Sequence, residues 1–108
     1  MPIFIKTEKF KDKALELSKS ERGKFLLMHK EWVKNINKSG HYIYSGYLIN
    51  EKNIPGGGGL LFLEAQDYLE AKKIIEKDPM IKNELVSWEL QEWISIDGSQ
   101  PKFSNHLG

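Results

Sequence analysis

The 108-residue chain contains no cysteine, which excludes disulfide bonds, thiolate metal ligands and a thiol nucleophile. It also has no apolar run near the length of about twenty residues that a membrane-spanning helix needs, and no basic-then-apolar leader before a cleavage site. Neither sign of charge dominates, because 16 basic and 15 acidic side chains give a formal net charge of +1. We therefore expect a cytoplasmic protein that binds neither membranes nor nucleic acid.

What the chain does contain is the composition of a folded protein, with 40% hydrophobic and 29% charged residues. A chain of this length can bury one modest core but not two. We expect one domain over residues 1–98, followed by a tail at residues 99–108 that shows no hydrophobic periodicity.

Two kinds of apolar pattern alternate along the chain. Runs of β-branched and aromatic residues predict strands at residues 2–6, 41–50, 60–64 and 85–97, and residues 7–13 are too polar to continue the first strand. Apolar steps of three and four predict a long helix at 20–40 and a second helix that begins at Asp67, with short helical turns at 11–17 and 80–84. This order is that of the ferredoxin-like α+β fold (βαββαβ), a four-stranded antiparallel sheet with both helices on one face.

The strands predicted at 41–50 and 85–97 carry large apolar groups on both faces. Ile43 and Tyr44 point to opposite faces of one strand, and Leu90 and Trp93 to opposite faces of the other. Because the helices can cover only one face of the sheet, we expect a second copy of the chain to cover the other face. The prediction is a homodimer formed through the sheet face.

Four consecutive glycines at positions 56–59 invite comparison with a phosphate-binding loop. Such a loop would lead into a helix, whereas this one leads into the apolar strand that begins at Leu60. We therefore expect a flexible hairpin connection that lets another group approach the backbone closely.

The long predicted helix places His29 on its apolar side. Steps of three and four put the histidine in one stripe with Phe25, Met28, Trp32 and Ile36. Arg22 lies two helical turns before His29 and points in nearly the same direction, so its guanidinium could flank the same cavity.

Both ends of this helix carry capping signals. Ser20 or Ser18 can cap the start, Ser18 as part of a capping box with Glu21, and Gly40 supplies the left-handed residue that ends it.

Four features of the chain resemble the YCII-related family of the dimeric α+β barrel superfamily, over about residues 4–96. The first is His29 in the first helix, and the second is Ser45-Gly46 in the second strand, at the spacing where the family has Ala-Gly-Pro. The third is the set of glycines that lead into an apolar strand at residues 58–63. The most specific is Asp78-Pro79-Met80-Ile81-Lys82, which is similar to the family's Asp-Pro-Tyr-Val.

The resemblance implies a dimeric α+β barrel whose histidine and aspartate lie together in a cleft, here His29 and Asp78. The family is regarded as a set of small-molecule enzymes, and one member type removes chloride from chlorinated hydroxyquinols. Two positions depart from the family pattern: Leu26 stands where an arginine is common, with Arg22 one turn earlier, and Tyr47 replaces the proline after the glycine.

These residues predict a cofactor-independent site for general acid-base chemistry, of a lyase or hydrolase-like kind. A histidine of ordinary pKa, about 6.5, can take and return a proton near neutral pH, and an aspartate on its other ring nitrogen would orient it. The predicted catalytic pair is His29 and Asp78. The predicted substrate-binding residues are Arg22, Ser45, Gly46 and Tyr47, and a hydroxylated aromatic substrate could stack on Tyr44, Tyr47 or Trp32.

Simpler interpretations of each residue stay open from the sequence. Asp78 precedes a proline, where an aspartate commonly caps a helix, and His29 could be a core histidine that donates to a backbone carbonyl. The alternative function is a homodimeric module that binds a small molecule without turnover. The geometry of the pair would distinguish the enzyme from the binding module. A separation of more than about 6 Å between His29 and Asp78, or a histidine sealed from solvent, would leave no room for shared proton chemistry.

A metal site is not expected. The three histidines, His29, His41 and His106, are widely separated and show no ligand spacing.

Overall fold

A computed structural model describes residues 1–98, so the predicted tail at 99–108 lies outside the described residues. Eight elements follow one another along the described chain. They are β1 (Ile3–Phe10), α1 (Asp12–Leu15), α2 (Lys19–Lys38), β2 (Ile43–Ile49), β3 (Pro55–Glu64), α3 (Tyr68–Ile75), α4 (Pro79–Lys82) and β4 (Val86–Trp93).

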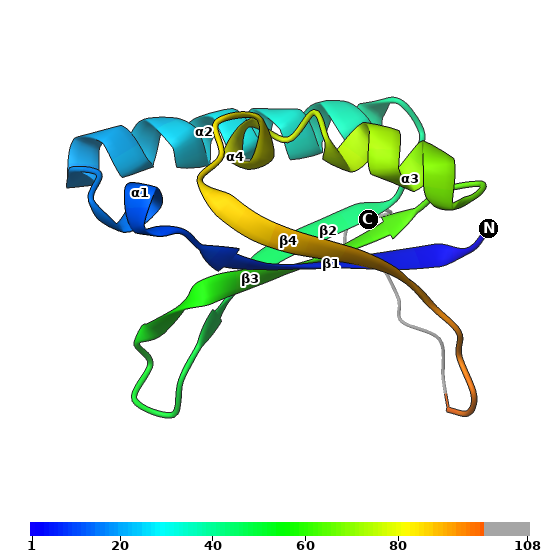
Figure 1. Cartoon of the computed structure of the whole chain (residues 1–108). Helices are drawn as coiled ribbons and strands as arrows, with labels where there is room; N and C mark the ends of the chain where they lie inside the picture. The colour runs from blue at the N-terminus through cyan, green and yellow to red at the C-terminus, as the bar shows by residue number, and fades with distance from the viewer. Residues whose placement is uncertain (99–108) are drawn as a thin grey trace.

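The four strands form one antiparallel sheet in the order β2-β3-β1-β4. All four helices lie on the same side of this sheet, and the other side carries no helix within the described residues (Figure 1). The predicted ferredoxin-like α+β fold is therefore confirmed. Its central strands are β1 and β3, which each pair with two neighbours.

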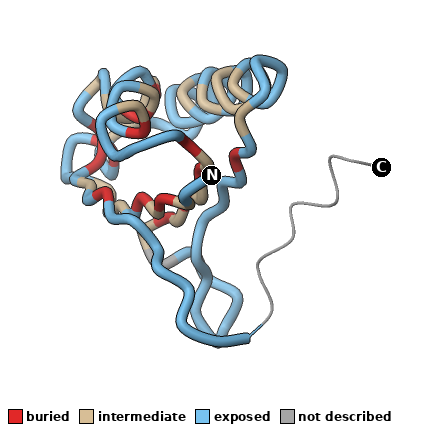
Figure 2. Tube along the Cα trace, turned by 90° about the vertical axis from the view of Figure 1, so that its right-hand side faces the viewer, coloured by how far each residue is buried: buried red, intermediate tan, exposed pale blue. Residues whose placement is uncertain are grey.

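The hydrophobic core lies between the sheet and the helices, where the buried segments gather in Figure 2. Its largest fully buried side chains come from strands and from α3, and they are Phe4, Leu61, Leu63 and Ile75. Burying side chains of this size contributes roughly 1.5–3 kcal/mol each. The core thus fixes α3 and the sheet together, and α2 packs against its edge.

No residue of α2 is fully buried, and the stripe that contacts the core overlaps the predicted stripe only at Trp32 and Ile36. Trp32, Val33 and Ile36 pack on the core, while the side chain of Met28 is 47% exposed. Helical geometry explains the difference, because successive residues are rotated by about 100°. Val33 lies closer than Met28 to the direction shared by His29 and Ile36.

Strand β1 is longer than predicted, since it continues through the polar residues to Phe10. It lies between β3 and β4, so its backbone groups are paired on both sides. Alternation places Lys6 and Glu8 on the same, helix-facing side as Phe4. The strand tolerates these charges because they are paired with one another rather than left in apolar surroundings.

Strand β3 is also longer than predicted, because it begins at Pro55 and takes in the glycine tract. Gly58 and Gly59 pair with β1 opposite Lys9 and Glu8. The glycines therefore belong to a paired strand rather than to a flexible connection. Strand β4 ends at Trp93, earlier than the predicted residue 97.

The predicted helix caps are confirmed. Ser18 Oγ accepts a hydrogen bond from the Glu21 backbone N–H, and the Glu21 carboxylate accepts one from the Ser18 backbone N–H. Gly40 adopts the left-handed conformation just beyond α2, with φ of +100°. Asp67 caps α3 by accepting from the Glu70 backbone N–H.

Residues 1–98 contain no helix with both the length and the apolar character needed to cross a membrane.

The crowding around Gly58 generates a first prediction. A Cβ atom at this position would lie 2.8 Å from the Glu8 carbonyl oxygen, so β1 and β3 would have to move apart. We expect Gly58→Ala to lower the free energy of unfolding by about 1–3 kcal/mol. Chemical denaturation followed by tryptophan fluorescence measures this change.

Gly23→Ala is the matched control, because Gly23 lies within α2 with nothing near its missing Cβ. Alanine favours helix, so this variant should be up to about 1 kcal/mol more stable than the native protein. Equal effects of the two substitutions would contradict the role given to Gly58.

Candidate active site

His29 connects the helical layer to the sheet. It projects from the middle of α2, and its two ring nitrogens contact different elements. Nδ1 lies 2.9 Å from Asp78 Oδ1, next to α4, and Nε2 lies 2.9 Å from Ser45 Oγ on β2. Its side chain is 13% exposed. The imidazole is therefore close to the aspartate and is not sealed from solvent, which are the two geometric requirements for shared proton chemistry.

Asp78 is fully buried and immediately precedes α4. Its Oδ1 accepts hydrogen bonds from His29 and, at 3.0 Å, from the Met80 backbone N–H. Its Oδ2 lies 3.3 Å from Lys6 Nζ. One carboxylate thus caps α4 and contacts the imidazole at the same time, so the two interpretations of this residue are compatible.

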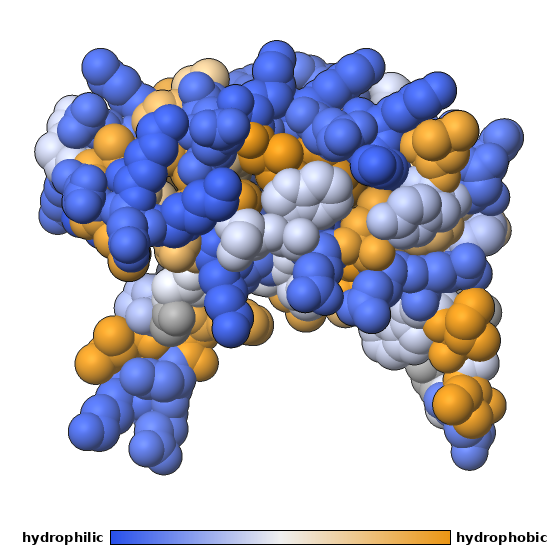
Figure 3. Space-filling model, viewed as in Figure 1, coloured by the Kyte–Doolittle hydropathy of each residue, from blue (hydrophilic) through white to orange (hydrophobic). Residues whose placement is uncertain are grey.

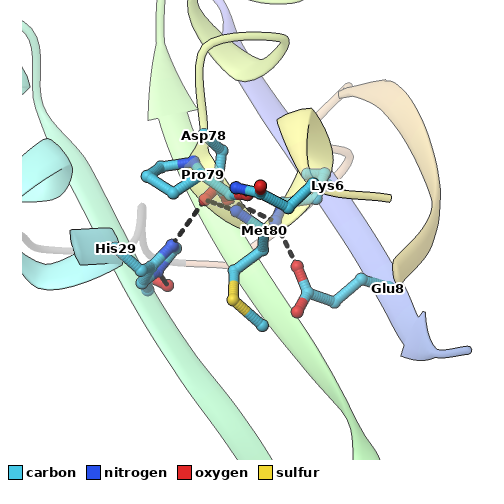
Figure 4. A network of polar contacts seen from close by, with 8 residues as sticks. Lys6, Glu8, His29, Asp78, Pro79 and Met80 are labelled. Atoms are coloured by element: carbon cyan, nitrogen blue, oxygen red, sulfur yellow. Dashed lines mark hydrogen bonds and ion pairs between the residues drawn. The ribbon is translucent and has the colours of Figure 1, made fainter. Parts of the chain in front are cut away.

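Lys6 and Glu8 complete a network of charges that the sequence analysis missed (Figure 4). The side chain of Lys6 is 1% exposed, and its ammonium donates to both Asp78 and Glu8. The signal that could have found them is the alternation from Phe4, which places both residues on the core face of a strand. That signal holds only if the strand continues past residue 6, which its polar composition argues against.

The pKa of Asp78 lies below its ordinary value of 3.8. Burial by itself raises the pKa of this carboxyl, but the hydrogen bond from His29, the positive charges of His29 and Lys6, and the Met80 N–H together outweigh it. Asp78 is therefore ionised at neutral pH.

An ionised Asp78 determines which nitrogen of His29 carries the proton. A carboxylate only accepts hydrogen bonds, so Nδ1 donates to Asp78 Oδ1. In the neutral ring Nε2 is then left as the acceptor, and the Ser45 hydroxyl donates a hydrogen bond to it. The basic nitrogen thus points toward β2 and away from the buried charges.

A cavity of about 490 Å³ opens beside this nitrogen, between α2 and the sheet. Most of its lining is apolar, and its charged and polar groups include those of Glu8, His29, Lys30 and Ser45. The other lining residues are Phe10, Leu26, Val33, Gly46, Tyr47, Gly58, Gly59, Leu60 and Met80. A volume of this size accommodates a substituted aromatic ring.

Three of the predicted substrate-binding residues, Ser45, Gly46 and Tyr47, line this cavity. The structure does not place Arg22 there. It is exposed at the start of α2, and Leu26, one turn nearer His29, is the first helical residue of the lining. Arg22 and His29 project in nearly the same direction from the helix, but they are seven residues apart, which is about 10 Å along the helix axis.

Of the three aromatic residues predicted to stack on a substrate, only Tyr47 lines the cavity. Tyr44 points to the opposite face of the sheet from Ser45. Trp32 packs behind the imidazole, with ring centroids 5.6 Å apart, and its indole N–H is buried without a hydrogen-bond partner within residues 1–98.

Across residues 1–98, no group of three or more histidine, aspartate or glutamate side chains converges in a way that could hold a metal ion.

No family model matches the chain, and no curated protein matches it in sequence. Solved structures do match it in fold. A 5-chloro-2-hydroxyhydroquinone dehydrochlorinase from Burkholderia phenoliruptrix, in complex with 2,5-dihydroxybenzoquinone, is 19% identical with a TM-score of 0.62, over 85% of this chain and 93% of that chain.

Two further structures share the fold at lower identity. The protein At3g17210 from Arabidopsis thaliana is 11% identical with a TM-score of 0.52, over 93% of this chain and all (100%) of that chain. The de novo designed protein Ferredog-Diesel is 16% identical with a TM-score of 0.55, over 84% of each chain. At these identities the likeness establishes the α+β ferredoxin-like fold, and the site has to be argued from this chain's own residues.

The buried charge of Asp78 generates a second prediction. Asp78→Asn leaves Lys6 with one carboxylate partner fewer, and we expect it to lower the free energy of unfolding by about 3 kcal/mol at neutral pH. Because the pKa of Asp78 is lowered in the folded state, its charge stabilises the fold above the unfolded pKa, and this contribution is lost as the pH falls through the folded pKa. The difference between native and variant should therefore shrink below about pH 4.

Asp67→Asn is the matched control, because Asp67 also caps a helix but is exposed. Asparagine caps as well as aspartate does, so this variant should stay within about 0.5 kcal/mol of the native protein. Denaturation curves recorded between acidic and neutral pH test both variants. A difference for Asp78→Asn that does not change with pH would contradict the electrostatic role.

Proposed function

We propose that this protein is a YCII-like enzyme that acts without a cofactor on a hydroxylated aromatic small molecule, with His29 as general base and acid. One observation carries the proposal. The imidazole is held by a fully buried carboxylate on Nδ1, while its other nitrogen lies at the wall of a cavity large enough for such a molecule.

The geometry supports a specific division of roles. A ligand hydroxyl that displaces the Ser45 hydroxyl at Nε2 would give its proton to the imidazole. Asp78 would hold the ring in the required tautomer and stabilise the imidazolium that forms. Ser45 remains near enough to donate a hydrogen bond to the ligand oxygen. These roles need no nucleophile.

An acid-base histidine suffices for elimination from a hydroxylated ring. His29 would take the proton of one hydroxyl and return a proton to the ring carbon that bears a leaving group. Departure of that group with its electron pair, together with loss of a proton from a second hydroxyl, leaves a quinone. The atoms and electrons balance without an outside oxidant. The fold neighbour described as a dehydrochlorinase, solved with 2,5-dihydroxybenzoquinone, makes this reaction class the first to test.

We also propose that the protein is a homodimer that pairs through the sheet face opposite the helices. This face carries an aromatic contact between Phe62 and Trp93, whose ring centroids are 5.5 Å apart. Trp93 is 41% exposed and Tyr44 is 44% exposed. Exposed aromatic groups of this size on one face favour an interface with another protein surface.

Two projections border this face and support the same proposal. The β2–β3 hairpin and the segment after β4 both extend away from the helices (Figure 1). Figure 3 shows hydrophobic groups on both projections. The exposed ones are Leu48, Ile49, Ile54, Ile94 and Ile96. A second copy of the chain, seated between the projections, would cover them together with the sheet.

The third prediction concerns catalysis. His29→Gln removes the basic nitrogen, and we expect turnover of an active substrate to fall by about 10²- to 10⁴-fold, the usual contribution of a general base. A panel of hydroxylated and chlorinated hydroxylated aromatic compounds should be followed by ultraviolet absorbance and by chloride release.

His41→Gln is the control for catalysis, because His41 contacts a backbone carbonyl and does not line the cavity. It should keep native activity. Ligand binding without turnover by the native protein would favour the alternative of a non-catalytic binding module. Equal rates in the native protein and His29→Gln would remove the catalytic role proposed for His29.

The fourth prediction concerns assembly. We expect the native protein to sediment as a dimer and Trp93→Glu to sediment as a monomer, because a buried unpaired carboxylate would oppose pairing of the sheets. Leu69→Glu changes an exposed apolar residue on α3, on the helical side, and should remain dimeric. A native monomer would contradict the proposed interface.

A further inference from the structure

Glu8 contributes a carboxylate to the cavity, whose lining also includes Lys30, and the proposed chemistry does not use this carboxylate. It lines the cavity from β1, while His29 and Ser45 line it from α2 and β2. Strand β3 lies between β1 and β2, so the backbones of β1 and β2 are about 10 Å apart. The cavity therefore has polar groups on two sides, with apolar walls between them.

The floor between these two sides is bare backbone because Gly59 has no side chain. Gly59 pairs with Glu8 on one side and with Tyr47 on the other. A Cβ atom there would lie 3.3 Å from Glu8 Cγ and 3.0 Å from the Gly46 carbonyl oxygen. The glycine thus leaves room for the Glu8 side chain and for a flat molecule beside it.

Among the described residues, Glu8 is paired through one of its two carboxylate oxygens. Lys6 donates to Oε1, and no hydrogen bond to Oε2 is made within residues 1–98. In Figure 4 the second oxygen is turned away from Lys6, and the Met80 side chain extends between Glu8 and His29. Since the Lys6 ammonium is buried against Asp78, it fixes the position of the Glu8 carboxylate.

A positioned carboxylate oxygen that faces a mostly apolar cavity favours a hydrogen-bond donor and repels an anion. We propose that Glu8 is a ligand-binding residue that selects molecules with a hydroxyl or amine at the end opposite the group held by His29, and that rejects a carboxylate at that end. The choice of a hydroxylated ring rests on the proposed function, but the selectivity is a matter of binding and requires no turnover.

Three probes of nearly equal size test this selectivity on the native protein. Hydroquinone carries a donor at both ends, 4-methoxyphenol lacks one donor, and 4-hydroxybenzoate carries an anion at one end. We expect calorimetry under anaerobic conditions to show hydroquinone binding about tenfold or more tightly than either of the others, since hydrogen bonds to charged groups are among the stronger ones. This comparison does not depend on the folding of any variant.

Glu8→Gln then tests the residue itself, with the fold checked by circular dichroism. The variant removes the charge but keeps the shape, so the preference for hydroquinone over 4-hydroxybenzoate should fall by about tenfold. Glu89→Gln is the matched control, because Glu89 lies on β4 and pairs opposite Thr7, on the other face of the sheet. It should keep the native preference.

The outcomes separate this proposal from the proposed function. Native selectivity that is lost only in Glu8→Gln supports the role of Glu8, even if no substrate turns over. Absence of selectivity in the native protein, lack of binding of all three probes, or an unchanged preference in Glu8→Gln overturns it. The catalytic proposal fails separately, through equal turnover in the native protein and His29→Gln.

Discussion

The structure depends on the way in which one buried carboxylate is compensated. Asp78 is completely removed from solvent, and an unpaired charge in such surroundings would cost several kcal/mol. Its partners come from three different elements: the Lys6 ammonium from β1, the His29 ring from α2, and the Met80 N–H from α4. Satisfying this single group therefore ties β1, one of the two central strands, to the long helix and to the connection before β4.

The same compensation prepares the candidate site for chemistry. His29, Lys6 and the Met80 N–H together keep the carboxylate ionised. Asp78 therefore fixes the tautomer of His29 and directs its basic nitrogen to Ser45 and the cavity. Lys6 also holds Glu8 at the other side of that cavity. The stability of the fold and the proposed function thus depend on one network of charges. Substitutions at Asp78 or Lys6 should change both. His29 and Glu8 are the members of the network that line the cavity. Gly59 of β3 contributes to the same site, because its missing side chain leaves the space between His29 and Glu8 open.

The sequence was informative where a property depends on neighbours along the chain. The capping box at Ser18, the cap at Asp67 and the placement of His29 on an apolar stripe follow from local spacing, and the order of elements restricts the topology to few choices. It was misleading where a property depends on distant groups. The polar residues after Ile5 did not suggest a central strand, because Lys6 and Glu8 can be buried as a pair only where Asp78, some seventy positions away, supplies a second carboxylate to Lys6. Arg22 has the right direction on the helix but lies beyond the end of the cavity, whose extent local spacing does not reveal.

By itself, the sequence determined the ferredoxin-like α+β order of strands and helices and their caps, while the pairing of His29 with Asp78 was implied by the family resemblance. Periodicity and capping are local and short-ranged, so they can be read from adjacent residues. Only the tertiary structure decided that His29, Asp78, Lys6 and Glu8 form one connected network, and that a cavity lies beside its two accessible ends. The reason is physical: the free energy of a buried charge depends on which groups surround it in space, and those groups come from segments far apart along the chain.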